Sequence, residues 1–266
     1  MSIELTYPDG CALVAGGAGK VGVGVTRRLA EAGLPVVFTY VSGAERATAI
    51  EADLRGRGLK VWARQMDMRD PASIDAAIDF SREVGGRLHT VACAAGAPVP
   101  FDNLADFDIK TVEDFVDADG MAYYRLVNRA VPVLRAGGGG SITLCTTIAL
   151  FRVIAFDGIS PFSKGAVDAM MRQIAWEEAA HGIRCNAVPI SWIMPGDGSQ
   201  FDTYIATLES PRRERLSTLI GQVKAMMRVA GPAAPEEAGD LFAFLASDQA
   251  RFITGQSIAI DAGATL

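Results

Sequence analysis

The stretch Gly16-Gly17-Ala18-Gly19-Lys20-Val21-Gly22 decides the fold, because it joins a short apolar run to a helical pattern. The run is Cys-Ala-Leu-Val-Ala at 11–15, and apolar residues recur at helical spacing from Val23 to Ala32. Glycines at this spacing let the backbone turn tightly and approach a pyrophosphate, which then meets the N–H groups at the helix start. The stretch predicts a dinucleotide-binding turn. A glycine-rich turn without a ligand is the alternative.

Strand-like runs and helical patterns alternate along the rest of the chain. Such alternation demands a mostly parallel sheet, because each crossover helix packs back onto the sheet. We expect one α/β Rossmann domain over residues 1–266, with a doubly wound seven-stranded parallel sheet and helices on both faces. The expected strands are 11–15, 36–40, 60–66, 90–94, 141–146, 183–188 and 257–261. The expected helices include 23–32, 74–84, 115–134, 166–179 and 235–246.

Proline positions and one long connection refine this outline. Asp70-Pro71 and Ala234-Pro235 place proline in the first turn of a helix, where its missing N–H does no harm. The stretch from Ile190 to Arg228 is irregular and longer than a tight connection needs. It is predicted to be a substrate lid.

Composition excludes several classes of function. The formal charge is −6 and no block of Lys or Arg occurs, so a nucleic-acid partner is not expected. The first ten residues lack the layout of a signal peptide, and no apolar run has the length of a membrane span. A cytoplasmic protein without a membrane partner is expected. The cysteines have no metal-ligand spacing and are interpreted as buried reduced thiols: Cys11, Cys93, Cys145 and Cys185.

Several motifs resemble those of the short-chain dehydrogenase/reductases, from the glycine turn to Asp261. The turn has the family's GxxGxxG spacing, with Ala15 in place of the preceding threonine. The other matches resemble the adenine-contacting Asp-Val, the Asn-Asn-Ala-Gly after strand four, IRVNAV and the FITGQ ending. Asp67-Met68 resembles the first of these motifs and residues 93–96 the second. Residues 183–188 resemble the third and 252–256 the fourth.

The resemblance implies a nicotinamide cofactor, and the end of the second strand indicates which one. Thr39-Tyr40-Val41-Ser42 contains no acid that would bind the ribose hydroxyls of NAD. Lys20 and Arg46 could neutralise a 2′-phosphate, so NADP(H) is favoured over NAD(H), although both could be ordinary solvated charges. The residues expected to bind the cofactor are Gly16, Gly19, Lys20, Val21, Gly22, Tyr40, Ser42, Asp67, Met68, Ala94, Ala95, Gly96, Lys164 and Ile193.

At the reaction centre the sequence departs from the family. The family relay uses YxxxK, a serine thirteen residues before the tyrosine, and an upstream asparagine. Here Lys164 matches the lysine and Ser160 stands at the tyrosine, while Thr147 replaces the serine. The asparagine maps onto Asp117, with Asp119 as an open alternative offset. A serine hydroxyl is a far weaker acid than a phenol, so the relay cannot work unchanged.

Two interpretations remain for the altered positions. If Asp117 lies near Lys164, it could form an ion pair with the ammonium, or handle the proton itself with a shifted pKa. Alternatively Lys164 only binds the cofactor ribose, Ser160 caps a helix that begins at Pro161, and Asp117 is a solvated helix residue. Other groups that could supply the proton are Tyr123, Tyr124 and Asp157.

Apolar side chains cluster in the segments expected to face a substrate. They are Phe151, Phe156, Trp192, Met194, Phe201 and Tyr204. They favour an apolar small-molecule substrate, or else they close the core or a subunit contact. The resemblance further implies a homodimer or homotetramer built through the fourth and fifth helices.

The sequence as a whole predicts an NADP(H)-dependent oxidoreductase of a carbonyl or alcohol, with an altered proton relay. One alternative is a dinucleotide-binding protein without dehydrogenase activity, which is a sensor or an inactive subunit. The other is an enzyme of the same fold with non-redox chemistry, in which Asp117 acts as a base. No metal site is expected.

Overall fold

A six-stranded parallel sheet organises the molecule. The computed structural model describes residues 4–196 and 199–266, apart from the side chain of Phe201. The strand order is β3-β2-β1-β4-β5-β6, and every pair of neighbours is parallel. The strands are β1 (Cys11–Ala15), β2 (Val36–Tyr40), β3 (Val61–Gln65), β4 (Leu88–Cys93), β5 (Gly140–Thr147) and β6 (Ile183–Ile190).

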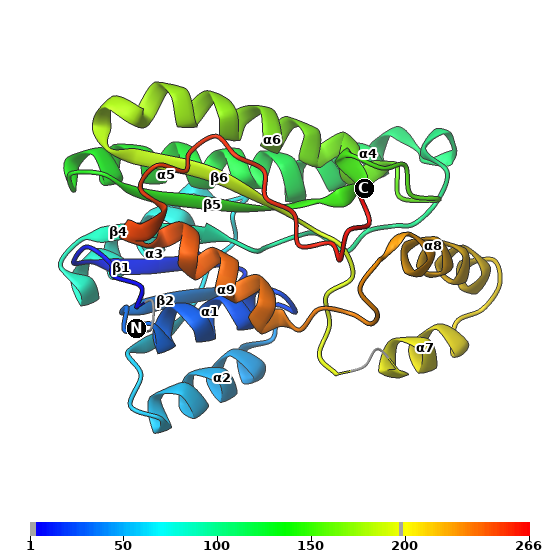
Figure 1. Cartoon of the computed structure of the whole chain (residues 1–266), viewed down its shortest axis with the longest axis horizontal. Coiled ribbons are helices and arrows are strands. Elements are labelled where there is room, and N and C mark those ends of the chain that lie inside the picture. The colour runs from blue at the N-terminus through cyan, green and yellow to red at the C-terminus, as the bar shows by residue number, and fades with distance from the viewer. Residues whose placement is uncertain (1–3, 197–198) are drawn as a thin grey trace.

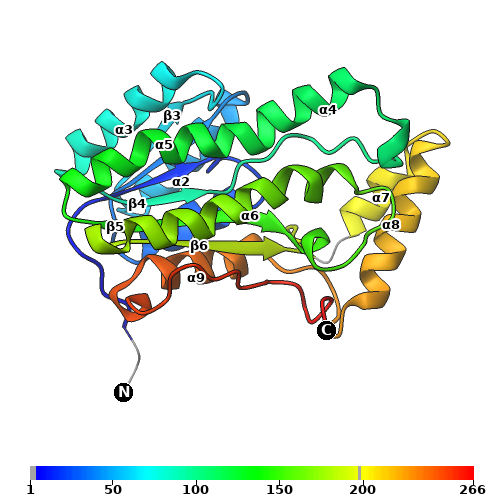
Figure 2. The ribbon, with the colours of Figure 1, turned by 90° about the horizontal axis from the view of Figure 1, so that it is seen from above.

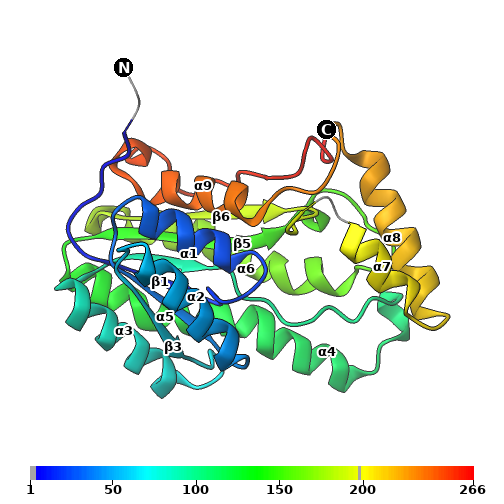
Figure 3. The ribbon, with the colours of Figure 1, turned by 90° about the horizontal axis from the view of Figure 1, so that it is seen from below.

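Helices cover both faces of this sheet (Figure 1). One face packs against α3 (Pro71–Gly85), α5 (Ala122–Ala136) and α6 (Ile159–Glu178), which Figure 2 shows from above. The other face carries α1 (Gly22–Glu31), α2 (Ala44–Gly56) and α9 (Pro235–Ala246), as Figure 3 shows. Three further helices gather at one end of the molecule: α4 (Ile109–Val116), α7 (Ser199–Ala206) and α8 (Arg212–Met226).

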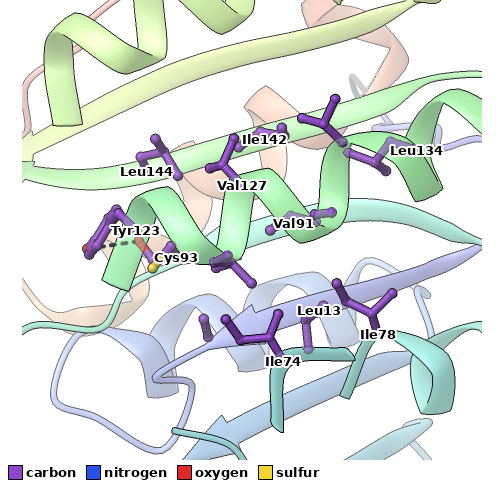
Figure 4. Packing of buried hydrophobic residues seen from close by; sticks show 14 of the residues in the cluster. Leu13, Ile74, Ile78, Val91, Cys93, Tyr123, Val127, Leu134, Ile142 and Leu144 are labelled. Carbon is purple, nitrogen blue, oxygen red and sulfur yellow. Dashed lines mark hydrogen bonds between the residues drawn. The ribbon is translucent and has the colours of Figure 1, made fainter. Parts of the chain in front are cut away.

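Each face of the sheet has its own apolar core. Figure 4 shows the core under α3 and α5, where Leu13, Val91 and Ile142 from three neighbouring strands meet the helices. Ile74 of α3 and Val127 of α5 complete this layer. Both cores leave the carboxyl ends of the strands free, which is where ligands bind in folds of this kind.

The predicted doubly wound sheet of seven strands is corrected to a parallel sheet of six. The segment 257–261 does run beside β6, but only isolated bridges join them, at Ala187–Ser257 and Ile190–Ile260. Pro189 explains the interruption. Its carbonyl accepts from the N–H of Ile260, yet proline has no N–H to donate toward the same segment, so the ladder lacks a bond.

The helix starts predicted at Pro71 and Pro235 are confirmed, whereas one predicted helix is divided. Asp70 caps α3 by accepting from the N–H of Ala72, and Pro71 and Pro235 open α3 and α9. The helix expected over 115–134 consists of α4 and α5, separated by a π-helical turn at Asp117–Met121. No helix in the described ranges is long and apolar enough to cross a membrane.

Candidate active site

A cleft of about 850 Å³ opens at the carboxyl ends of the strands. It begins at the turn after β1, passes the ends of β2 and β4, and reaches the end of β5 and the start of α6. One continuous space therefore joins the glycine turn to the residues expected to do chemistry. Of the residues predicted to bind a cofactor, those that line it are Gly16, Gly19, Lys20, Val21, Tyr40, Ser42, Ala94, Ala95, Gly96 and Lys164.

The glycine turn requires glycine for steric reasons. Gly16 has φ +71°, and a Cβ there would lie 2.6 Å from Ala95 Cα. At Gly22 a Cβ would lie 2.1 Å from the carbonyl oxygen of Gly16, so the first residue of α1 must also be glycine. Because these positions carry no side chain, an extended ligand can lie along the turn. The start of α1 is then a suitable place for its phosphate groups.

Two cations stand where the second strand ends. Lys20, Ser42 and Arg46 all line the cleft and are exposed, and Arg46 Nη2 lies 3.4 Å from the carbonyl oxygen of Gly19. No acidic side chain lines this end of the cleft among the residues that the structure describes. The charge pattern suits an additional phosphate group rather than free ribose hydroxyls.

Four predicted cofactor residues do not line the cleft. Gly22 is buried and acts through packing. The carboxylate of Asp67 is bound by Arg69, whose hydrogen bonds lower its pKa. Met68 is buried beside the Cys93 thiol, and Ile193 forms a backbone bridge with Ala233.

A buried ion pair lies at the inner end of the cleft. Lys164 Nζ is 2.9 Å from Asp119 Oδ1, and only 10% and 3% of these side chains are exposed. The ammonium also stands 3.7 Å from the centre of the Tyr123 ring. Lys164 is therefore held from two sides, by a carboxylate and by an aromatic face.

The packing of α5 on α6 brings this pair together. A Cβ at Gly120 would lie 2.9 Å from Ser163 Oγ, so the π-helical turn approaches α6 closely only because position 120 has no side chain. Turns of this type insert an extra residue into a helix and often occur at functional sites.

The structure corrects the mapping of the family asparagine onto Asp117. Asp117 points to the surface, forms an ion pair with Arg125 at 2.5 Å and does not line the cleft. Asp119 is two residues further on and takes the place beside Lys164. The π-helical turn sets which carboxylate points inward, and the apolar pattern from 115 to 134 gives no sign of it.

Tyr123 and Tyr124 are unsuited to replace the missing tyrosine. The Tyr123 hydroxyl donates to the carbonyl oxygen of Ala95 at 2.6 Å, and burial raises its pKa well above the usual value. Figure 4 shows the Tyr123 ring beside Cys93, and this fully buried residue lines the inner end of the cleft. Tyr124 is half exposed and does not line the cleft.

Ser160 does not cap a helix, contrary to the sequence-based expectation. Helix α6 begins at Ile159 with Gly158 as its N-cap, so Ser160 lies inside the first turn and only 6% of it is exposed. Its hydroxyl and N–H lie near the carboxyl group of Asp157 and lower the pKa of that group. Both residues line the cleft together with Lys164.

Thr147 lies at the end of β5 and lines the cleft as expected. Its oxygen accepts from the N–H of Ala149 at 3.1 Å, which orients the side chain and leaves the hydroxyl hydrogen free to donate. Neighbouring Thr146 has a buried hydroxyl with no hydrogen-bond partner in the described part of the chain. The end of β5 therefore offers donors to a bound oxygen atom.

The aromatic residues predicted to face a substrate lie elsewhere. Phe151 and Tyr204 are about half exposed, and neither they nor Phe156, Trp192 or Met194 line the cleft. The side chain of Phe201 lies outside the described part of the structure. The apolar lining instead comes from Pro98, Val99, Phe101 and Phe115, which sequence reasoning missed. They occupy a loop and a helix end without a recognisable pattern.

The predicted lid contains two helices that pack beside the cleft. Leu216 and Ile220 of α8 and Ile205 of α7 form an apolar cluster with Ile148 and Ile154. An ion pair of 2.5 Å between Arg215 of α8 and Asp102 ties the cluster to the loop after β4. Positions 197 and 198 of this segment lie outside the described residues. Among the described residues, no cluster of three or more His, Cys, Asp or Glu could hold a metal ion.

Known proteins resemble this chain along nearly its whole length. A family model described as enoyl-(acyl carrier protein) reductase matches residues 16–265. Oxidoreductase UcpA of Escherichia coli is 30% identical over 96% of this chain and 94% of its own. (-)-trans-Carveol dehydrogenase of Rhodococcus erythropolis is also 30% identical, over 96% of this chain and 97% of its own.

A solved structure agrees with these matches. A short-chain type dehydrogenase/reductase from Mycobacterium ulcerans superposes with a TM-score of 0.84 at 25% identity, covering 98% of this chain and 91% of that chain. The cleft, the glycine turn and the retained lysine position lie where the motifs predicted them. The chain belongs to the short-chain dehydrogenase/reductase family, whose members are oxidoreductases that bind nicotinamide dinucleotides.

Proposed function

We propose that the protein is an NADP(H)-dependent oxidoreductase that interconverts a carbonyl and an alcohol on an apolar small molecule, with an altered proton relay. The observation that supports this most is the single cleft that joins the glycine turn to Lys164. If a dinucleotide binds along it, the start of α1 would hold its phosphates, and Thr147 and Lys164 would lie near its reactive ring.

The residues present fit such a cofactor. The turn at Gly16 and Gly19 has no side chain that would block an extended ligand, and Ala94 to Gly96 line the same cleft. When bound, the nicotinamide ring supplies or accepts a hydride. Lys20, Ser42 and Arg46 support the preference for a 2′-phosphate, because they provide positive charge and hydrogen-bond donors at the end of β2.

The chain's own residues prepare the reacting oxygen. Thr147 donates a hydrogen bond toward it, and Lys164 provides a fixed positive charge that is balanced by Asp119. The phenol beside the ammonium, Tyr123, has its hydroxyl bonded to the carbonyl oxygen of Ala95, so we assign Lys164 to binding the cofactor ribose and to supplying positive charge near the reacting oxygen. The proton must come from another group.

An apolar substrate fits the lining at the outer part of the cleft. Val99, Phe101 and Phe115 line the cleft, and Phe101 also packs against the apolar cluster of α7 and α8. The segment 190–228 is assigned as a lid over this space. The name of the carveol dehydrogenase relative, which specifies an alcohol substrate, is consistent with this assignment.

The same reasoning extends to assembly and location. Ile109 of α4 and Phe162 and Trp176 of α6 are exposed apolar residues, which suits a homodimer or homotetramer through this face. Four free buried cysteines suit the reducing cytoplasm. Analytical ultracentrifugation of the protein and of a Trp176→Glu variant tests the assembly.

Titration of the protein with NADPH and NADH, followed by fluorescence, is the primary test. We expect NADPH to bind at least tenfold more tightly, and cyclic apolar ketones to be reduced with loss of NADPH absorbance. No binding of either dinucleotide would refute the proposal. NADPH binding without turnover of any carbonyl would support the second candidate, a sensor or inactive subunit, which is motivated by serine at the tyrosine position.

A further inference from the structure

Asp157 is a buried carboxyl group inside the reaction end of the cleft. It lies in the short segment between β5 and α6, only 8% of the residue is exposed, and its side chain lines the cleft. Its Oδ1 atom has no hydrogen-bond partner among the described residues. Buried carboxylate oxygens are nearly always bonded in native proteins, so an unpartnered one in a cleft indicates a partner that arrives with a ligand.

The backbone around Asp157 is held in a strained and fixed conformation. Phe156 has φ +62°, a region that bulky residues rarely adopt and that occurs most often at functional sites. Asp157 also forms a backbone bridge with Asp102, whose own carboxylate is bound by Arg215 of α8. The Phe156 backbone and the bridge to Asp102 therefore both fix the position of the Asp157 carboxyl group in the cleft.

Its surroundings favour the protonated form. Burial is the main cause that raises the pKa of Asp157 to about 6, and the nearby charge of Asp119 adds to the rise. The hydroxyl and N–H of Ser160 lie near the carboxylate and oppose this rise in its pKa. Two nearby cations are already paired with other carboxylates. Lys164 is paired with Asp119 at 2.9 Å, and Arg215 is paired with Asp102. Among the described residues, no arginine or lysine forms an ion pair with Asp157.

We propose that the Asp157 carboxyl group is the proton donor and acceptor of the reaction, and that Ser160 positions it. This assignment rests on the proposed function and names the group that replaces the family tyrosine. In reduction, the carbonyl carbon gains a C–H bond from the hydride of the reduced nicotinamide dinucleotide. The carbonyl oxygen gains an O–H bond as the O–H bond of Asp157 breaks. The resulting carboxylate recovers a proton from water in the open cleft, and oxidation runs in reverse.

A carboxyl group in this role gives a definite pH dependence. Reduction requires the protonated form, so its rate falls as the pH rises through about 6, whereas oxidation requires the carboxylate and rises over the same interval. Removing the Ser160 hydroxyl removes a bond to the charged form, so the pKa of Asp157 should rise further in Ser160→Ala. A tyrosine-like group would instead give a transition at alkaline pH.

The first readout needs no cofactor and no turnover. Protein labelled with ¹³C at the aspartate carboxyl carbons is titrated by NMR, and the signal of Asp157 is identified by its loss in Asp157→Asn. We expect an inflection near pH 6 in the wild type and a higher one in Ser160→Ala. An inflection near the ordinary value for aspartate would overturn the assignment.

The second readout separates chemistry from binding. We expect Asp157→Asn to bind NADPH with an unchanged Kd and to lose about 100-fold or more in single-turnover reduction. Asp114→Asn, which changes an exposed aspartate on α4, is the matched control and should retain both. Thermal unfolding of each variant checks that it is folded.

The two proposals fail in distinguishable ways. If Asp157→Asn binds NADPH and reduces a ketone with the wild-type rate and pH profile, the assignment of Asp157 is wrong while the proposed function stands. If the wild-type protein binds neither dinucleotide, the proposed function is wrong and the role of Asp157 is refuted with it.

Discussion

The two ends of the cleft obey different constraints. At the glycine end, Gly16 and Gly22 are fixed by backbone contacts that no side chain could share, and the sequence keeps the family pattern there. At the reaction end, Lys164 matches the lysine of the family motif, whereas Thr147, Ser160 and Asp119 stand where the resemblance leads us to expect serine, tyrosine and asparagine. Binding a dinucleotide depends on backbone shape, which tolerates little change, whereas proton transfer depends on a group with a suitable pKa that several positions can supply.

The reaction end also contains more buried charged and polar groups that lack full pairing than the glycine end does. A buried ion pair lies in this region, together with Asp119 Oδ2, Asp157 Oδ1 and the Thr146 hydroxyl, which have no hydrogen-bond partner among the described residues. At the glycine end the charged groups Lys20 and Arg46 are exposed and need no internal partner. We therefore expect substitutions at the reaction end to change stability most, and those at the glycine end to change binding.

The largest effect is expected for Asp119→Ala. This variant leaves the Lys164 ammonium buried without a counter-charge, which should lower the free energy of unfolding by about 3–5 kcal/mol. Asp117→Asn affects a half-exposed carboxylate and should change the free energy of unfolding by less than about 1 kcal/mol. Urea unfolding monitored by circular dichroism measures both. Equal losses would mean that the two aspartates are not distinguished by burial.

The second effect has the opposite sign and depends on pH. The pKa of Asp157 is raised in the folded protein, so the folded state binds its proton more tightly and loses stability as the pH rises from about 4 to about 6. Asp157→Asn should therefore be more stable than the wild type by about 3 kcal/mol above pH 6, and equally stable below pH 4. Urea unfolding at pH 3.5 and 7.5 tests this, and a pH-independent difference would contradict it.

The third effect concerns the glycine turn. Gly22→Ala brings a Cβ onto the carbonyl of Gly16 and should destabilise the protein by about 1–3 kcal/mol, with loss of dinucleotide binding. Gly56→Ala is the control, because a Cβ there meets nothing within 4 Å, and it should be neutral or slightly stabilising. Thermal unfolding and NADPH titration measure the two variants. Retained binding in Gly22→Ala would show that the turn adapts.

The smallest effect distinguishes the two cofactors. Lys20→Ala should weaken NADPH binding about tenfold and leave NADH binding unchanged, because it removes one charged donor from the proposed phosphate position. Lys60→Ala changes another exposed lysine, outside the cleft, and should affect neither. If Lys20→Ala weakens both cofactors equally, Lys20 contacts the pyrophosphate rather than a 2′-phosphate.

The sequence by itself determined the parallel α/β fold, most strand positions, the glycine turn and Lys164. These features follow from short-range rules: alternation of apolar runs, proline at helix starts, and glycine where a backbone must approach closely. The sequence also showed that no tyrosine stands at position 160, which raised the question of the proton donor.

Only the tertiary structure decided what the local patterns left open. Pro189 reduced seven predicted strands to six through a missing hydrogen bond to a segment about 70 residues away. The π-helical turn chose Asp119 over Asp117, and the packing of α5 on α6 buried it against Lys164. Burial of Asp157 and the cleft lining at Phe101 and Phe115 are likewise set by distant elements. Burial, pairing and pKa depend on neighbours that the chain brings together only when it folds, so no local pattern contains them.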